Sequence, residues 1–478
     1  MNASCPPPVP RSARRLPLWV LLIIIMEVVL LGLVAGLLIR WQGWRRGVQR
    51  ETSSQLARIK AAGLPVNSEE LDRWYAAVPA SLNAALVYTN AIAQLEPKVG
   101  PQESRPWTKL SLPSRSQPVT NGLRGEIEKA VRQNRAALEL AHRAAAIPHS
   151  RYPIRLSAGM FAQLPHLGEL RRLAFLLELE ALAHMEEGRW PAAADSVSAS
   201  LSVARSLYGE PLLMSQMVAT SIEAGSSRSL EHLLNQTSLP DDKLVLLLRQ
   251  IVLAETTNRY VRALVGERAI GIELCQMAEY DPWRLAQLEE EQQSKWDGPK
   301  QRVDGSAWPV PPLGFFERDL AFFLRCMEAN LAAVALPPPL SLAATNEIEQ
   351  LYARSDKGYY IMSRLLLPRV TGMLARDAEH RARLRTALSA LAVERWRAVH
   401  GGELPKSLTA LVPVYLPAVP HDPYDGQSLR FKRLARGFVV YSIGVDGRDD
   451  GGKEKPPKSV PQSPAQPSGF DTTFTVER

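Results

Sequence analysis

An uninterrupted apolar segment near the N-terminus constrains this chain more than any other feature. It runs for 24 residues, from Leu16 to Ile39, and Glu27 is its one ionisable residue. As a helix it would be about 36 Å long, enough to cross a hydrocarbon core of about 30 Å. It is too long for the apolar part of a typical signal peptide, and arginines rather than a small-residue cleavage site follow it. We therefore predict one permanent transmembrane helix at residues 16–39, preceded by a cytosolic tail at residues 1–15.

The basic charge of the chain is concentrated around this segment. The 478 residues hold 57 Lys and Arg against 49 Asp and Glu, a net charge of +8. Residues 1–50 hold seven Arg and one Glu, a balance of +6, which leaves +2 for the other 428 residues. Such a distribution is typical of arginines that touch lipid headgroups and not of a nucleic-acid-binding surface. We expect the lipid bilayer as a partner and no nucleic acid.

Two features inside the apolar segment leave alternatives open. Gly32 and Gly36 form a G-x-x-x-G pattern that allows close helix packing and a homodimer, although small residues are also common in membrane helices. Glu27 lies near mid-membrane, where a carboxyl either contacts a partner helix or is tolerated in its protonated form. We treat Glu27, Gly32 and Gly36 as candidate membrane-helix contacts.

The middle of the chain has the periodicity of stacked helices. Residues 40–120 are predicted to form a helical stalk and a loop, and residues 121–375 a helical domain. A tight turn at Gly188 joins two amphipathic stretches around Ala181 and Ala193. With Trp190 and Ser200, these residues resemble one tetratricopeptide-type helical hairpin. No second copy follows at the 34-residue period, so we predict a divergent stack of helical hairpins that binds proteins or spaces them apart.

Three cysteines exclude a disulfide-stapled scaffold. Cys5 lies in the N-terminal tail, where no apolar run precedes it as a lipid-anchored cysteine would require. Cys275 and Cys326 fall on apolar helical stretches and are either buried free thiols or, in an exported domain, a disulfide pair.

The last hundred residues differ in character from the helical middle. A long helix at 374–400 is followed by Gly402, Pro405 and Leu411 in a G-x-x-P-x-x-x-x-x-L stretch. Two strand-like segments at 429–434 and 437–442 then form a hairpin, and a final strand is predicted at 472–476. The other recognisable patterns are Leu416-Pro417, Asp422-Pro423-Tyr424 and Ser442-x-Gly444-x-Asp446-Gly447.

This order of motifs resembles the globular domain of the major pseudopilin of type II secretion systems, over residues 376–478. Leu22 stands where the processing glycine of a pseudopilin would lie before Glu27, so we expect no prepilin processing. The whole chain resembles bacterial membrane-anchored families that attach such a module to a helical region. The resemblance implies a role in secretion or envelope assembly and a bulk that lies outside the cytoplasm.

In that family the aspartate-glycine loop binds calcium, and the same residue types occur here. Asp446, Asp449 and Asp450 offer carboxylates, Ser442 or Ile443 offers a carbonyl, and Asp471 could return to the loop with the final strand. Ca²⁺ takes six to eight such oxygen ligands. An EF-hand does not fit, because Arg448 and Pro457 occupy its ligand positions. The alternative is a solvated turn without a metal.

The predicted fold class is mainly α, with a single transmembrane helix, a helical hairpin stack and a small α+β pilin-like module with an antiparallel sheet. No H-E-x-x-H, G-x-S-x-G or C-x-x-C motif points to an enzyme. We expect an inner-membrane, single-pass interaction or scaffold protein with an extracytoplasmic body and an unidentified protein partner. The alternative is a membrane-tethered, hydrolase-like enzyme with an acidic, calcium-dependent site.

Overall fold

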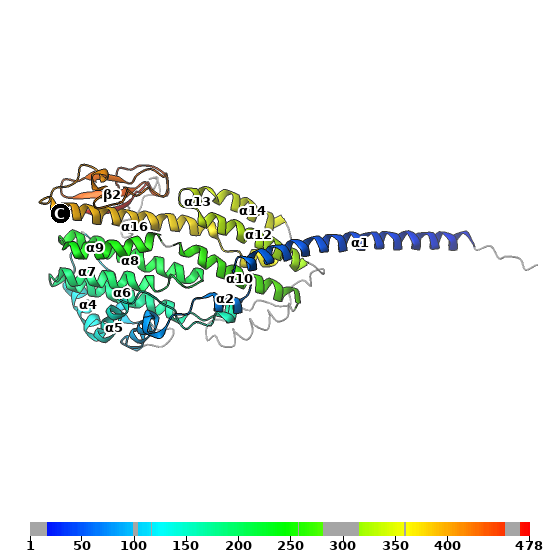
Figure 1. The fold of residues 1–478 in the computed structure, drawn as a ribbon, viewed down its shortest axis with the longest axis horizontal. Coiled ribbons are helices and arrows are strands. Elements are labelled where there is room, and N and C mark those ends of the chain that lie inside the picture. Colours follow the sequence, from blue (N-terminus) through cyan, green and yellow to red (C-terminus); the bar gives the residue numbers. More distant parts are fainter. Residues whose placement is uncertain are drawn as a thin grey trace, which may run out of the picture.

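The computed structural model describes residues 17–98, 104–115, 117–256, 258–280, 315–357, 360–454 and 469–478. The described part of the protein is mainly helical, with 68% of these residues in helices and 5% in strands. Its helices form an elongated body, and a single helix projects from one end of that body (Figure 1). The predicted helical character is therefore confirmed, as is one N-terminal helix long and apolar enough to cross a membrane.

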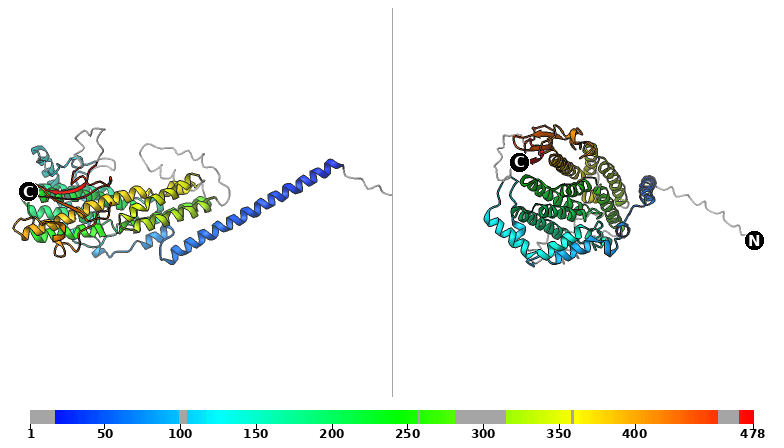
Figure 2. Two further views of the ribbon diagram at one scale, coloured as in Figure 1. Left: turned by 90° about the horizontal axis from the view of Figure 1, so that it is seen from above. Right: turned by 60° about the vertical axis from the view of Figure 1, so that its left-hand side comes forward.

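The projecting helix is α1 (Leu18–Ala61), which is 44 residues and therefore about 66 Å long. Its apolar first half is uncovered, and the left view of Figure 2 shows it extending away from the body. Its second half packs against α12 (Phe315–Ala335). There the Glu317 carboxylate accepts hydrogen bonds from Arg45 and Gln49, at 3.3 and 2.9 Å. One continuous helix therefore joins the apolar segment to the folded body.

An elbow separates α1 from the next helix. Gly63 has a φ of 69°, a conformation that L-residues with a side chain rarely adopt. The Asn67 side chain then accepts a hydrogen bond from the backbone N–H of Glu70 and caps α2 (Ser68–Trp74). The chain therefore leaves α1 through a glycine turn and enters α2 at a capped N-terminus.

The body is assembled from helical hairpins. The hairpin of α6 (Pro165–Glu186) and α7 (Trp190–Arg205) turns at Gly188, whose φ is 70°. Helix α8 (Leu213–Gln236) packs on both of these helices, and α9 (Asp241–Thr256) packs on α7. The other helical elements of the described residues are η1 (Ala80–Leu82), α3 (Ala84–Ala93), η2 (Pro106–Lys109), α4 (Asn121–Gln133), α5 (Arg135–Ala145), η3 (Leu156–Phe161), α10 (Arg259–Tyr280), α13 (Leu340–Ala343), α14 (Thr345–Lys357), α15 (Ile361–Leu366) and η5 (Leu408–Leu411).

Helices α10 and α12 pack closely in the half of the body nearest α1. A side chain at Gly271 would overlap the ring of Phe323, so the glycine permits this close approach. Cys275 and Cys326 lie on these two helices as buried free thiols. The structure therefore favours the free-thiol interpretation over a disulfide, and Cys5 lies outside the described residues.

A small sheet covers one side of the long helix α16 (Val370–Val399), as Figure 1 shows. Its three antiparallel strands run in the order β1 (Arg430–Arg433), β2 (Phe438–Ser442), β3 (Thr472–Val476). The central strand β2 is buried throughout, since α16 also packs against it. The predicted antiparallel sheet is confirmed, and the predicted boundary at residue 376 falls inside α16.

The end of the chain is tied to the helical body. The Asn235 side chain of α8 bonds both the backbone O of Thr475 and the backbone N of Glu477, at 2.7 and 2.8 Å. The Arg478 guanidinium contacts the buried Glu394 carboxylate of α16. The sheet therefore packs against α8, from the predicted helical domain at residues 121–375, and against α16, most of which lies in the predicted module at residues 376–478.

Candidate functional site

The three membrane-helix residues lie on the uncovered half of α1. Gly32 and Gly36 have no atom of another element within 4 Å of an added Cβ, and the Glu27 side chain is exposed. The two glycines share one face of the helix. Glu27 is nine residues, about 2.5 turns, from Gly36 and therefore lies on the opposite face. A dimer formed through the glycines would leave Glu27 outside its interface.

The structure brings two of the predicted loop carboxylates together. The Oδ2 atoms of Asp450 and Asp446 lie 2.6 and 3.1 Å from the position of a Cβ added to Gly469. Only a glycine leaves room for both carboxylates at this point. Asp471 lies beside them, and its carboxylate accepts hydrogen bonds from the backbone N–H groups of Asp450 and Gly452, at 3.4 and 2.7 Å.

The other predicted ligands are turned toward different partners. Asp449 accepts from the Gly451 N–H at 2.9 Å and lies 3.9 Å from Arg430. The Ser442 hydroxyl and the Ile443 N–H both donate to Asp422, at 2.8 and 2.9 Å. Asp446, Asp450 and Asp471 therefore cluster, whereas Asp449, Ser442 and Ile443 serve other contacts.

Asp422 organises this part of the structure. Its carboxylate is fully buried and forms an ion pair with Arg430 at 2.6 Å, in addition to its bonds to Ser442 and Ile443. It also accepts from the Tyr424 N–H at 3.0 Å. The carboxylate of the Asp422-Pro423-Tyr424 motif therefore anchors the end of strand β2.

No group of three or more His, Cys, Asp or Glu side chains is placed to hold a metal ion within the part of the chain that the structure describes. Calcium binding at the aspartate-glycine loop stays a prediction.

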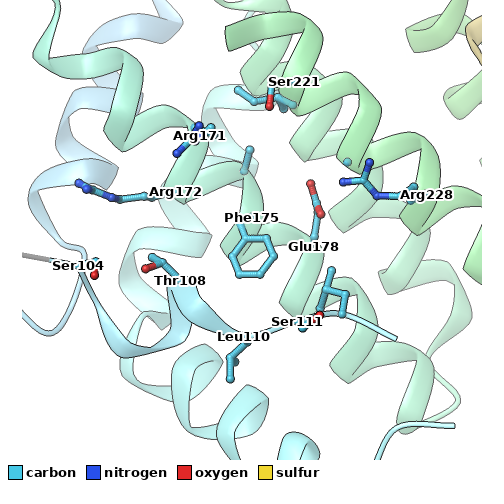
Figure 3. Close-up of a pocket in the computed structure, with 14 residues that line it drawn as sticks. Ser104, Thr108, Leu110, Ser111, Arg171, Arg172, Phe175, Glu178, Ser221 and Arg228 are labelled. Carbon is cyan, nitrogen blue, oxygen red and sulfur yellow. The ribbon is translucent and has the colours of Figure 1, made fainter. Parts of the chain in front are cut away.

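A pocket that the sequence did not predict lies between α6, α8 and residues 104–112. It has a volume of about 580 Å³, within the usual range of small-molecule sites. Arg171, Phe175 and Glu178 project from one face of α6, at helical spacings of four and three residues. Gly225 and Arg228 face them from α8, and Figure 3 shows the Glu178 carboxylate between Arg228 on one side and Arg171 on the other.

Glu178 is the buried ionisable group of this pocket. Its side chain is only 7% exposed, and it makes no hydrogen bond or ion pair with any described residue. Burial raises its pKa from 4.5 to about 7, although the nearby charge of Arg228 acts in the opposite direction. A Cβ at Gly225 would overlap the carboxylate, so the glycine of α8 creates the space that Glu178 occupies.

The arginines at the rim of the pocket differ in their partners. Arg172 pairs with Glu169, which also binds Arg105 at 2.9 Å. Arg171 and Arg228 are exposed and form no ion pair or hydrogen bond with the described residues. The pocket therefore presents two unpaired guanidinium groups at its rim and one unpaired carboxylate at its floor.

Several other buried carboxylates of the body have protein partners. His142 binds Glu180 at 2.7 Å, and His166 binds Glu210 at 2.8 Å. Glu223 is fully buried against Arg259 and His380, and these cations hold its pKa near 2 against the effect of burial. Glu178 differs from these carboxylates in lacking a bonded partner.

Comparison of the chain with protein-family models, curated proteins and solved structures finds no match.

Proposed function

We propose that the chain is a single-pass membrane protein whose extracytoplasmic body serves interaction or scaffolding at the inner membrane. One observation carries this proposal: α1 is continuous from its uncovered apolar half to the part that packs on α12. The ion pair between Arg45 and Glu317 fixes the body only a few residues beyond the apolar segment. Such a helix would hold the body directly at the bilayer surface.

The orientation can be tested with cysteine labelling in sealed right-side-out membrane vesicles. The native thiols of Cys275 and Cys326 are buried, and burial raises the pKa of Cys326 to about 12, so neither should react. A Gln133→Cys variant adds an exposed thiol to α4. We expect a membrane-impermeant maleimide to label residue 133 in intact vesicles and Cys5 only after lysis. The reverse pattern would place the body in the cytoplasm.

The C-terminal layer is the proposed partner-binding module, with a role in secretion or envelope assembly. Support comes from the antiparallel sheet on α16 and from the pseudopilin-like order of motifs. Strand β1 forms an edge of that sheet, and Lys432 is exposed on it. A photo-crosslinking residue in place of Lys432, in the protein as it lies in native membranes, should give one discrete adduct. The same crosslinking residue in place of Glu139 on α5 should not give that adduct. Equal or absent adducts at the two positions would contradict this role.

Calcium binding at the aspartate-glycine loop is part of the same proposal. Asp446 and Asp450 point to one place beside Gly469, and Asp471 lies next to them. We expect millimolar Ca²⁺ to raise the melting temperature of the full chain in detergent, and an Asp450→Asn variant to lose this shift. Glu139→Gln, an exposed acid on α5, is the matched control. No shift in the native chain would eliminate the site.

A membrane-tethered enzyme is the second candidate, and the pocket at Glu178 supports it better than the acidic loop does. A carboxyl with a pKa of about 7 can donate or accept a proton at neutral pH. Turnover of ester, peptide or phosphate-ester substrates should then disappear in Glu178→Gln and persist in Glu128→Gln. Turnover that survives in Glu178→Gln, or none in the native chain, would argue against this candidate.

A further inference from the structure

We propose that the pocket between α6, α8 and residues 104–112 binds a small zwitterion, with its amino group at Glu178 and its anionic group at Arg171 and Arg228. This proposal concerns the body alone and is independent of the membrane topology and of the C-terminal module.

The first argument is the unsatisfied carboxylate at the floor of the pocket. Buried carboxylates in proteins are normally paired or hydrogen-bonded, because an isolated buried charge is costly. Glu178 has no such partner among the described residues, although its side chain is 93% buried. Gly225 leaves the carboxylate the space that it occupies, and the carboxylate lines the cavity. An N–H donor on a ligand would supply the missing hydrogen bonds.

The second argument is that the nearest cation does not satisfy Glu178. Arg228 lies on the facing helix, and Figure 3 shows its guanidinium to one side of the carboxylate. The two groups interact electrostatically but do not form an ion pair. Both of them line the cavity, so a ligand that enters the pocket lies within reach of each group.

The rim of the pocket is positively charged. Arg171 and Arg228 line the pocket from two helices, and neither forms an ion pair with an acid among the described residues. Guanidinium groups bind carboxylates and phosphates through paired N–H donors. A ligand with only an amino group would leave the two arginines without an anionic partner. A ligand with only an anionic group would leave Glu178 without a hydrogen-bond donor. A ligand that carries both charges satisfies the rim and the floor together.

The dimensions of the pocket limit the size of this ligand. A volume of about 580 Å³ accommodates a molecule of dipeptide size, and Phe175 and Leu110 provide apolar surface for its central part. In Figure 3 the Phe175 ring lies beside the Glu178 carboxylate, on the side away from Arg228. The anionic group could be a carboxylate, as in a peptide, or a phosphate, as in an aminoalkyl phosphate.

Calorimetric titration of the full chain in detergent tests this proposal. The probes are alanyl-alanine and O-phosphoethanolamine, with N-acetyl-alanyl-alanine and alanyl-alanine amide as forms that lack one charge. We expect the zwitterions to bind at least about tenfold more tightly than either blocked form, since each lost charge removes a charge-assisted hydrogen bond. The preferred zwitterion identifies the anionic group as carboxylate or phosphate.

Two variants separate the roles of the floor and the rim. Glu178→Gln should abolish the preference for the free amine, and Arg171→Ala should abolish the preference for the free anion. The controls Glu128→Gln and Arg132→Ala alter an exposed ion pair on α4 and should change neither preference. The proposal is wrong if neither zwitterion binds, if N-acetyl-alanyl-alanine binds as tightly as alanyl-alanine, or if Glu178→Gln retains the preference for the free amine.

Discussion

Replacement of Glu178 by Gln should stabilise the body, and the gain should increase with pH. The folded protein holds the pKa of this carboxyl near 7, whereas its ordinary value is 4.5. Between pH 4.5 and pH 7, the Glu178 carboxyl is protonated in the folded state and ionised in the unfolded state. The free energy of unfolding therefore falls as pH rises through this range. The destabilisation is absent below pH 4.5 and complete above pH 7.

The magnitude follows from the two pKa values. A pKa raised from 4.5 to about 7 corresponds to about 3 kcal/mol of lost stability once the group is ionised. The side chain is only 7% exposed, so screening by water removes little of this cost. We expect the difference in unfolding free energy between the native chain and Glu178→Gln to change by about 2 to 3 kcal/mol from pH 5 to pH 8.

Urea denaturation of the full chain in detergent, followed by tryptophan fluorescence, measures this difference. Other groups that titrate in the same range contribute equally to both proteins and cancel in the comparison. Glu128→Gln is the matched control, because its exposed carboxylate should give a change of less than about 0.5 kcal/mol at every pH. A difference that stays constant between pH 5 and pH 8 would show that Glu178 is well solvated and would refute the reasoning.

Three further substitutions test other parts of the structure. Gly225→Ala places a methyl group on the Glu178 carboxylate and should lower the free energy of unfolding by about 1 to 3 kcal/mol, which a lower melting temperature would reveal. A second substitution, Glu178→Ala, in the same chain should restore the lost stability. Asp422→Asn leaves Arg430 without its buried anion and should destabilise the sheet by about 3 kcal/mol, which limited proteolysis of the C-terminal hundred residues would detect. Gly36→Leu should abolish crosslinked dimers in bilayers if α1 pairs through its glycine face, and dimers that persist would exclude that face.

Local signals in the sequence were sufficient to predict many elements. The apolar segment of α1 and the strand at Thr472–Val476 depend on neighbouring residues and on hydrophobic periodicity. The packing of α16 against both α9 and the sheet could not be predicted, since it depends on contacts between distant segments. The sequence motifs change near residue 376, which is why a domain boundary was predicted there. Helix α16 runs through this position without a break.

The two candidate sites also differ in how much of them the local sequence could predict. Asp446, Asp449 and Asp450 are close in sequence, but which carboxylates converge depends on where Gly469 returns. Glu178 lies among leucines on α6, where its neighbours in sequence gave no sign of a pocket. Its environment is made by Gly225, 47 residues later, and by the loop at residues 104–112. A glycine in the interior of α8 was the available signal, and it has meaning only when the facing helix is known.

If α1 spans the membrane as proposed, its unbroken course couples the tilt of the membrane segment directly to the orientation of the body. Between Ile39 and the ion pair of Arg45 with Glu317 there is no turn of the chain at which a change in tilt could be absorbed. Membrane helices adjust their tilt to the thickness of the surrounding hydrocarbon. The angle at which the body meets the membrane would therefore follow bilayer thickness, so the lipid composition would set which face of the body is presented to neighbouring proteins.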